Sequence, residues 1–598
     1  MTILEVGINK TYKSISEAIN AAVDGDEIKI YPGFYNETFD CLKDLIFTGV
    51  PDDTKDFSTY PQIYNGDENQ VNSIIGKCSF SNIIFVEQKA AELKDYEKIL
   101  GGEKLSDELI KKYRREEEEN SHLEVFCLVV ENESHFENCH FIGGRNYGVI
   151  VDLNNTKKAP VFVNCGFYLN YYAGIHVVGK KSSPAVVFQN CKIGYNGNGI
   201  YGGNFELNNC EIHHNYSNGV LFMANESRLE HCDLYRNGCG ISGGEKGAIS
   251  INETNIHTNY SEGINLINNS KLLMNKSEVR MNKDGVIIGG KSTLLAVECD
   301  FKDNGGDGFL CLDKSEITLQ NCLVSENEEK GIEVNNKAKV SVYDSRILNN
   351  SDDGVYAGKN CSINLRGSDF IENRNGVHLK GKAEGIINTC AFASNSDCEL
   401  FVTENSKCQV EKSHFVTKQL PEKHKKNERA VAIMCADKTD SKFNDCEFRS
   451  QKTKDTILAI LMGEADGYFT DCIFQEAENG IVVYNRSGCE IKKCKFVDCA
   501  KLDIYHKSKL TSWVVVEDTE LSEATKKHLS ITEIEIVRPL LPKLNEEDRK
   551  IILMYYNLYS ENPEEEYRLT DDELALYFNI PVKRVVAAFN KIAKLAEE

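Results

Sequence analysis

The sequence predicts an all-β solenoid, a stack of short strands, followed by a small α-helical domain. The main observation is a glycine that recurs at intervals of 20 to 26 residues and settles at 22 or 23. An apolar residue follows each glycine and opens a short segment of alternating apolar positions, which is typical of a strand. A period of this length indicates stacked units, because one unit cannot bury its apolar face alone. These glycines are Gly148, Gly174, Gly199, Gly219, Gly240, Gly263, Gly285, Gly308, Gly331, Gly354 and Gly376.

Two further positions recur in each unit. An Asn-Cys pair, as in Asn190-Cys191 and Asn209-Cys210, precedes a short strand, and Ser or Thr replaces the cysteine in several units. A second asparagine, such as Asn215 or Asn237, comes three or four residues before the glycine. Asparagine tolerates left-handed backbone, and its amide can bond the equivalent amide about 4.8 Å along a stack. We interpret these asparagines as a structural ladder.

The repeat resembles the right-handed parallel β-helix of the pectate-lyase-like superfamily, over roughly residues 1–535. We expect a capping segment at 1–40, a β-helix at 41–535 with a charged helical insertion near 88–122, and a helical domain at 541–598. The resemblance implies a carbohydrate-active enzyme as one function. In such enzymes, carboxylates on neighbouring rungs of an outer face do the chemistry.

The amino-acid composition predicts where the protein is located and which partners it disfavours. Eleven of the 22 cysteines occupy one repeat slot that also accepts Ser or Thr, which indicates a small inward side chain rather than a disulfide partner. Many reduced thiols predict a cytoplasmic location. The N-terminal residues are no signal peptide, and no apolar run is long enough to span a membrane. The net charge of −23 disfavours nucleic acid and anionic membranes as partners. No motif predicts a metal site or a cofactor.

The strand after each repeat glycine offers a test for catalytic residues. If its first and third residues point inward, the second points outward, and only Glu333 among these outward residues is acidic. No acid pair is thus expected on this face, and no catalytic residue is assigned. Glu333, Tyr356 and His378, which fall on successive units, are the remaining catalytic candidates.

The same outward positions carry many apolar and aromatic side chains, which predicts a surface that binds a protein partner or a second copy of the chain. The alternative is that other segments of the chain cover this face. The partner-binding candidates are Tyr201, Leu221, Leu310, Tyr356 and Phe401.

Residues 572–589 look like a helix-turn-helix, with Asn579 at the turn and Pro581 at the start of the second helix. Lys583, Arg584, Lys591 and Lys594 are the candidate nucleic-acid contacts on this second helix. However, residues 541–598 hold 8 basic and 12 acidic residues, so affinity for phosphate should be weak.

These observations favour an intracellular, non-enzymatic β-helix scaffold or adaptor that binds proteins through the exposed strand face and the C-terminal helices. The alternative is a polysaccharide lyase or glycoside hydrolase. A further alternative is DNA binding through the C-terminal helix-turn-helix.

Overall fold

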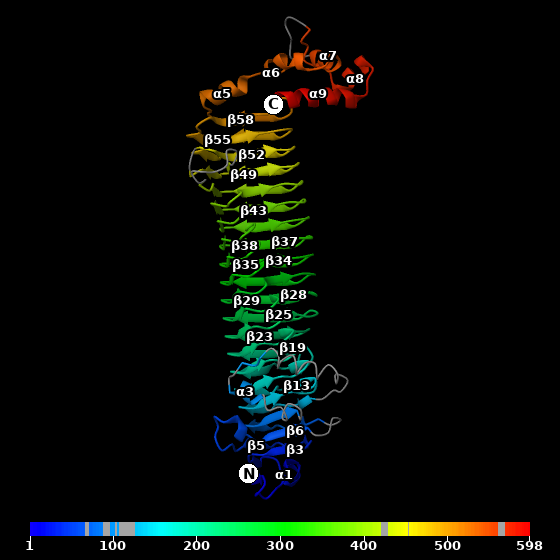
Figure 1. Ribbon diagram of the computed structural model, residues 1–598, viewed down its shortest axis with the longest axis vertical. Coiled ribbons are helices and arrows are strands. Elements are labelled where there is room, and N and C mark those ends of the chain that lie inside the picture. The colour runs from blue at the N-terminus through cyan, green and yellow to red at the C-terminus, as the bar shows by residue number, and fades with distance from the viewer. Residues whose placement is uncertain are drawn as a thin grey trace. The chain divides into compact units, whose positions relative to one another are not determined.

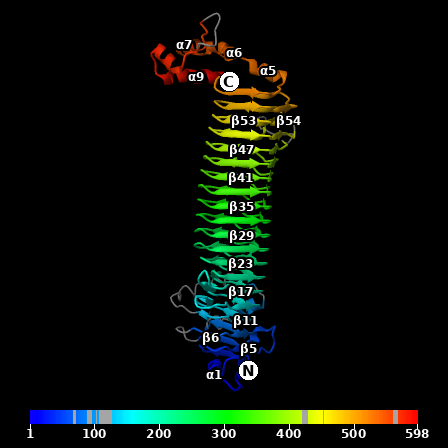
Figure 2. The ribbon, with the colours of Figure 1, turned by 180° about the vertical axis from the view of Figure 1, so that it is seen from behind.

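The computed structural model describes residues 1–65, 71–87, 96–101, 104–106, 126–419, 429–451, 454–559 and 568–597. The chain forms two compact units, residues 1–351 and 352–598. Within each unit, short parallel strands lie one above the next (Figures 1 and 2). The predicted all-β parallel solenoid is therefore confirmed. No helix among the described residues is long and apolar enough to cross a membrane.

Each complete coil contributes one strand to each of three parallel sheets, which we name A, B and C in chain order. One coil of the first unit shows the plan, with β20 (Phe205–Asn208) in sheet A, β21 (Glu211–His213) in sheet B and β22 (Asn218–Phe222) in sheet C. Each strand pairs in parallel register with the strand of the same sheet in the next coil, as Glu211 does with Asp233. The sequence on one coil therefore lies directly beside the equivalent sequence of its neighbours.

Six consecutive strands of sheet B have three residues each. They are β12 (His140–Ile142), β15 (Gly166–Tyr168), β18 (Lys192–Gly194), β21, β24 (Asp233–Tyr235) and β27 (Asn255–His257). The corresponding strands of sheet C are β13 (Tyr147–Asp152), β16 (Ala173–Val178), β19 (Asn198–Gly202), β22, β25 (Cys239–Gly243) and β28 (Glu262–Leu266).

The core is a column of stacked apolar side chains. Phe136, Phe162 and Phe188 stack face to face along sheet A, with ring centroids 4.7 and 5.0 Å apart. The middle residue of each sheet B strand, such as Ile212 or Leu234, is fully buried in the same column. None of the 22 cysteines forms a disulfide bond, and every one except Cys499 is buried. At the Asn-Cys slot, small thiols thus fill the space at one corner of many coils, and Ser or Thr takes this place in others.

The asparagine ladder links each coil to the next. Asn237 Oδ1 accepts hydrogen bonds from the backbone N–H of Asn215 (3.1 Å) and from Asn215 Nδ2 (2.9 Å). Asn237 Nδ2 in turn donates to Asn259 Oδ1 (3.1 Å) and to the carbonyl of Ile212 (3.0 Å). The amides are buried, so each one satisfies polar groups of its neighbours that water cannot reach.

Helices lie near both ends of the chain. The first unit begins with β1 (Ile3–Val6) and α1 (Ile15–Ala21), whose Ile15, Ala18 and Ile19 are buried. Of the predicted insertion near 88–122, the structure describes α3 (Tyr96–Leu100) and residues 101 and 104–106, and the rest lies outside the described residues. The second unit ends with α5 (Glu523–Ser530), α6 (Glu533–Val537), α7 (Glu546–Tyr555), α8 (Asp571–Phe578) and α9 (Val582–Glu597).

Replacing a ladder amide tests how much the stack depends on it. Asn237→Ala leaves several buried donors and acceptors unpaired, so we expect the free energy of unfolding to fall by about 3 kcal/mol or more. Asn20→Ala, on the exposed side of α1, is the matched control and should change it by about 0.5 kcal/mol or less. Denaturant unfolding of both variants measures this, and equal stability of the two would contradict the ladder's role.

Candidate functional site

A cluster of polar side chains covers the outer face of sheet B from β18 to β27. In these three-residue strands the middle side chain points inward, so the first and third point outward. Because the strands are in register, first positions line up along the stack and so do third positions. The members of this sheet B cluster are Lys192, Glu211, His213, Asp233, Tyr235 and His257.

Two carboxylates occupy neighbouring rungs at the first position. Glu211 pairs in register with Asp233, so their backbones lie about 4.8 Å apart. Glu211 Oε1 accepts a hydrogen bond of 2.5 Å from the Tyr235 hydroxyl, and Glu211 Oε2 lies 3.2 Å from Lys192 Nζ. Asp233 Oδ1 lies 3.0 Å from His257 Nε2. Each carboxylate therefore has a partner that fixes its direction.

Aromatic rings stack along the third position. The centroids of His213 and Tyr235 are 5.3 Å apart, and those of Tyr235 and His257 are 5.5 Å apart. Gly194 takes this position on the preceding rung, where an added Cβ would lie 2.5 Å from the His213 ring. The glycine therefore leaves the space that the His213 imidazole occupies. His213 Nδ1 also lies 2.9 Å from Nδ1 of His214, so one ring donates a hydrogen bond to the other.

Burial and neighbouring charges set the protonation states of the cluster. Burial alone would raise the pKa of Glu211, but the Tyr235 hydroxyl and the Lys192 ammonium outweigh it and hold this pKa below its ordinary value. Burial lowers the pKa of His213 to about 4. Burial and then the hydrogen bond to Glu211 raise the pKa of Tyr235. Near neutral pH the cluster thus combines an ionised Glu211, a neutral His213 and a protonated Tyr235.

A cavity of about 240 Å³ lies over this cluster. Its wall includes three cationic side chains, Lys104, Lys192 and Arg236, and Ile99 of α3. Ile99 and Leu105 are buried against Tyr168, Leu169 and Tyr195, so this part of the insertion covers sheet B at one end of the cluster. The cavity is therefore a partly covered, positively lined recess within an acidic protein. Among the described residues, no group of three or more His, Cys, Asp or Glu side chains is arranged to hold a metal ion.

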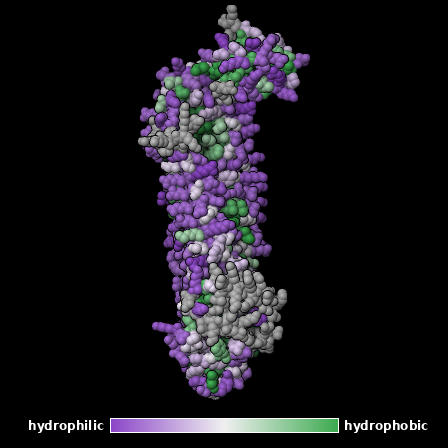
Figure 3. Space-filling model, in the orientation of Figure 1, coloured by the Kyte–Doolittle hydropathy of each residue, from purple (hydrophilic) through white to green (hydrophobic). Residues whose placement is uncertain are grey.

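The five predicted partner-binding residues all lie outward on sheet C, and each is half-buried rather than exposed. Tyr201, Leu221 and Leu310 belong to the first unit, where Tyr201 stacks on His176 at 4.7 Å. Tyr356 and Phe401 belong to the second unit, and Phe401 packs against a buried cluster around Val431 and Ile460. The face drawn in Figure 3 is mostly hydrophilic, with hydrophobic side chains in small separate groups.

The three catalytic candidates on sheet C have structural partners. Glu333 Oε2 lies 2.8 Å from Lys330 Nζ, and Glu333 Oε1 accepts a 2.5 Å hydrogen bond from Asn335 Nδ2. His378 Nδ1 lies 2.9 Å from Asp353 Oδ2, and its ring stacks on Phe401 at 4.6 Å. Tyr356 meets His378 edge to face at 5.2 Å. Glu333 belongs to the first unit, and Tyr356 and His378 belong to the second.

The candidate nucleic-acid contacts lie on α9, after a turn at Asn579 that adopts left-handed backbone. Two of the four cations pair with a carboxylate of α7, since Arg584 and Lys591 lie 2.5 and 2.8 Å from Asp548. Lys583 is exposed, and Lys594 is exposed near Asn590 and Glu464. Arg584 and Lys591 thus hold α9 against α7.

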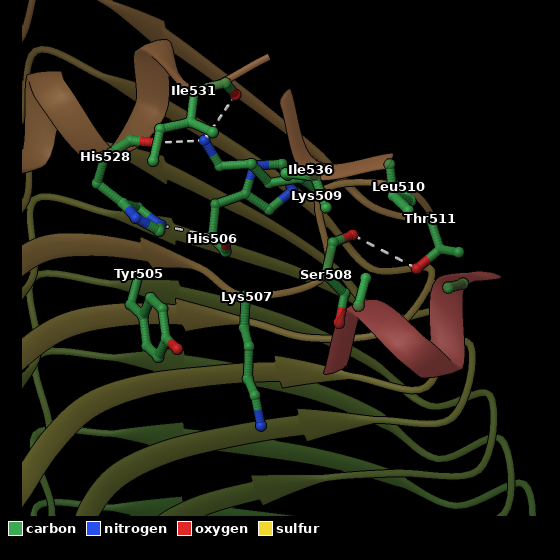
Figure 4. Close-up of a pocket in the computed structure, with 12 residues that line it drawn as sticks. Tyr505, His506, Lys507, Ser508, Lys509, Leu510, Thr511, His528, Ile531 and Ile536 are labelled. Atoms are coloured by element: carbon green, nitrogen blue, oxygen red, sulfur yellow. Dashed lines mark hydrogen bonds between the residues drawn. The ribbon is translucent and has the colours of Figure 1, made fainter. Parts of the chain in front are cut away.

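A second cavity, of about 190 Å³, lies in the second unit between the last rungs and the helices (Figure 4). Lys509 Nζ donates to the carbonyls of His528, Leu529 and Ile531 at the end of α5. His528 Nε2 lies 3.2 Å from the carbonyl of His506. These contacts fasten α5 to the solenoid, so we assign this cavity a structural role.

Sequence reasoning missed the sheet B cluster because it tested only the strand after each repeat glycine. The signal was present in the residues that flank the middle apolar position after the Asn-Cys slot. There the chain reads Glu211-Ile212-His213, then Asp233-Leu234-Tyr235, then Asn255-Ile256-His257. The prediction of no acid pair concerned only the strands after the repeat glycines, whereas sheet B carries acids on neighbouring rungs, Glu211 and Asp233.

The outward cluster lies on a solenoid of a known class. The model of the right-handed β-helix region matches residues 201–345 and 330–508, which together span just over half of the chain. The chain therefore belongs to the right-handed β-helix family, as the resemblance implied. A comparison with curated protein sequences gives no match.

Several solved structures are similar in fold. The periplasmic alginate epimerase AlgG has 11% identity and a TM-score of 0.27, over 63% of this chain and 78% of that chain. Pectate lyase Pel9A has 12% identity and a TM-score of 0.22, over 76% and 78%. The A-module of the Azotobacter vinelandii mannuronan C-5 epimerase AlgE4 has 11% identity and a TM-score of 0.23, over 72% and 89%.

These findings correct the prediction of a non-enzymatic scaffold. The three structures named above are a pectate lyase and two epimerases, and their likeness to this chain is one of fold alone. The premise of the scaffold prediction, an outer surface without paired acids, also fails at Glu211 and Asp233. Sequence identities of 11 to 12% indicate a shared fold alone, so the chemistry of this chain has to follow from the sheet B residues themselves.

The protonation state of His213 can be measured directly. We expect its ring to titrate near pH 4 instead of its ordinary 6.5, since burial disfavours the charged form. Between these two values the unfolded chain binds more protons, so acidification through this window lowers the free energy of unfolding.

Histidine NMR checks the ring titration, with His213→Gln to assign the signal. That variant should also reduce the loss of stability between pH 6.5 and 4, whereas His414→Gln, at an exposed site of β48 (His414–Val416), should not. A His213 titration near pH 6.5 would show that the ring is open to water.

Proposed function

We propose that the chain is a polysaccharide lyase that cleaves an acidic, 1,4-linked polysaccharide at the sheet B cluster. The observation that carries the proposal is the set of contacts around Glu211. Its carboxylate contacts Lys192 and Tyr235 and lies in register beside a second acid on the next rung, Asp233. A histidine kept neutral by burial lies beside them. Such groups with shifted pKa values in one recess are typical of catalytic sites.

The charges of the recess support an acidic substrate. Lys104, Lys192 and Arg236 line it although the whole chain carries a net charge of −23. A sugar carboxylate would gain favourable contacts there and would meet repulsion over much of the remaining surface. Cations near that carboxylate would also stabilise the negative charge that forms when the adjacent carbon loses its proton.

The protonation states favour elimination over hydrolysis. A glycoside hydrolase needs one carboxylic acid that holds its proton and gives it to the leaving oxygen. The lowered pKa of Glu211 opposes that role. Elimination instead needs an unprotonated base and a separate acid that holds its proton, and His213 and Tyr235 are in these two forms near neutral pH.

The reaction follows from this arrangement. The neutral His213 takes the proton from the carbon next to the carboxylate, and the bond from the neighbouring carbon to the glycosidic oxygen breaks. A carbon–carbon double bond forms between these two carbons, and Tyr235 gives its proton to the leaving oxygen. Glu211 acts as a positioning residue, because its carboxylate holds the Tyr235 hydroxyl.

The test is turnover of polygalacturonate and polymannuronate, with a neutral 1,4-linked glucan as the negative control. We expect an unsaturated uronate product, detected by ultraviolet absorbance and mass spectrometry. His213→Gln and Tyr235→Phe should each lower kcat by about 10²-fold or more, because each removes one proton-transfer group.

The matched control is Glu278→Gln in β30 (Glu278–Arg280), which occupies the same strand position as Glu211. Glu278 pairs with Arg280 and Lys302 outside the cluster, so its loss should leave kcat unchanged. Saturated products with new reducing ends would show hydrolysis, and no turnover of either acidic polymer would overturn the proposal.

A further inference from the structure

The turns that lead from sheet B to sheet C alternate in length over five successive coils of the first unit, from Asn170 to Asn259. After the ladder asparagines Asn170, Asn215 and Asn259, the turn has two residues before the next strand pairs. After Asn196 and Asn237 it has one residue, Gly197 or Gly238. In two of these turns the first residue is an exposed tyrosine, Tyr216 or Tyr260, and we name these two side chains the tyrosine row. In the turn after Asn170 the exposed tyrosine is the second residue, Tyr172, at the position that Ser217 and Ser261 take in the later turns.

The tyrosine row is exposed, with relative accessibilities of 72% for Tyr216 and 73% for Tyr260. The intervening one-residue turns consist of glycine, because the neighbouring backbone leaves no room for a Cβ atom. A Cβ at Gly197 would lie 2.2 Å from the carbonyl oxygen of Tyr171, and one at Gly238 would lie 2.3 Å from that of Ser217. Aromatic rings therefore stand on alternate rungs with a gap between them.

Backbone hydrogen bonds fix the spacing of the row. Tyr216 N–H donates to the Asn196 carbonyl at 2.8 Å, and Tyr260 N–H donates to the Asn237 carbonyl at 2.9 Å. Neighbouring parallel strands lie about 4.8 Å apart, so the backbones of Tyr216 and Tyr260, two rungs apart, are about 9.6 Å apart. Tyr216 follows β21 and Tyr260 follows β27, so the row lies beside the rungs of the sheet B cluster. It forms one margin of that outer face.

We propose that the tyrosine row is a set of stacking subsites for alternate sugar rings of an extended acidic polysaccharide that lies along the solenoid axis. A sugar unit in an extended 1,4-linked chain advances by nearly the length of one rung, so every second sugar meets a tyrosine. The C–H face of a pyranose packs on the electron-rich face of an aromatic ring. This inference rests on the proposed function, since it gives the substrate of the sheet B cluster a direction and a minimum length.

Tyr172, at the other turn position, packs against the aromatic residues of sheet C. Its ring meets Tyr147 edge to face at 5.4 Å and Tyr201 at 5.7 Å. Tyr172 is therefore not part of the row. Tyr216 and Tyr260 lie next to the rungs of Glu211 and His257.

Binding to a catalytically silent protein tests the row without interference from turnover. In a Tyr235→Phe background, isothermal titration calorimetry compares the dimer and the hexamer of galacturonate and of mannuronate. We expect Tyr216→Ala and Tyr260→Ala each to weaken hexamer binding by about tenfold and to leave dimer binding unchanged. Tyr216→Phe, which keeps the ring, should restore the affinity. Tyr577→Ala, at a 65% exposed site of α8, is the matched control and should have no effect.

The outcomes separate this inference from the proposed function. If the wild-type chain cleaves the polymer but Tyr216→Ala and Tyr260→Ala bind the hexamer normally, the tyrosine row is overturned and the lyase stands. If the two variants lose hexamer affinity but the wild-type chain cleaves nothing, the row stands and the lyase is overturned. Absence of both binding and cleavage for both polymers overturns both proposals.

Discussion

The in-register stacking of coils is the constraint on which the other features depend. Each buried ladder amide satisfies polar groups of the coils beside it, so one coil cannot shift relative to the next without leaving buried groups unpaired. Fixed register places equivalent positions of successive coils about 4.8 Å apart. A catalytic cluster can then be assembled from residues about 20 positions apart in the chain, as Glu211 and Asp233 are.

Much of the fold can be predicted from the sequence, because equivalent positions of successive coils recur at a regular interval along the chain. The repeat glycines and the Asn-Cys slot predict short parallel strands, and the ladder asparagines predict the bonds seen between Asn215 and Asn237. The site was harder to read, because three sheets offer three outer faces and the period alone does not say which face carries chemistry. The signal at Glu211 and His213 becomes visible only once the register aligns them with Asp233 and Tyr235.

The side chains around Glu211 distinguish the sheet B cluster from equivalent outward positions elsewhere in the solenoid. Glu278 and Asp300 also form an acid pair in register, but their neighbours are Arg280 and Lys302, so they form ion pairs on the surface. Glu211 also has a lysine neighbour, Lys192, but it lies beside Tyr235 and the buried His213 as well, and part of the insertion covers one end of the recess. The difference between a structural acid pair and a candidate catalytic pair thus lies in burial and in the rings beside it.

The most direct test of the central claim is a crystal structure of the Tyr235→Phe variant with bound hexagalacturonate or hexamannuronate. The account predicts sugar density along the outer face of sheet B, with a carboxylate near Lys192 and the chain parallel to the solenoid axis. Density confined to sheet C or to the cavity beside His506, with an empty sheet B face, would contradict it.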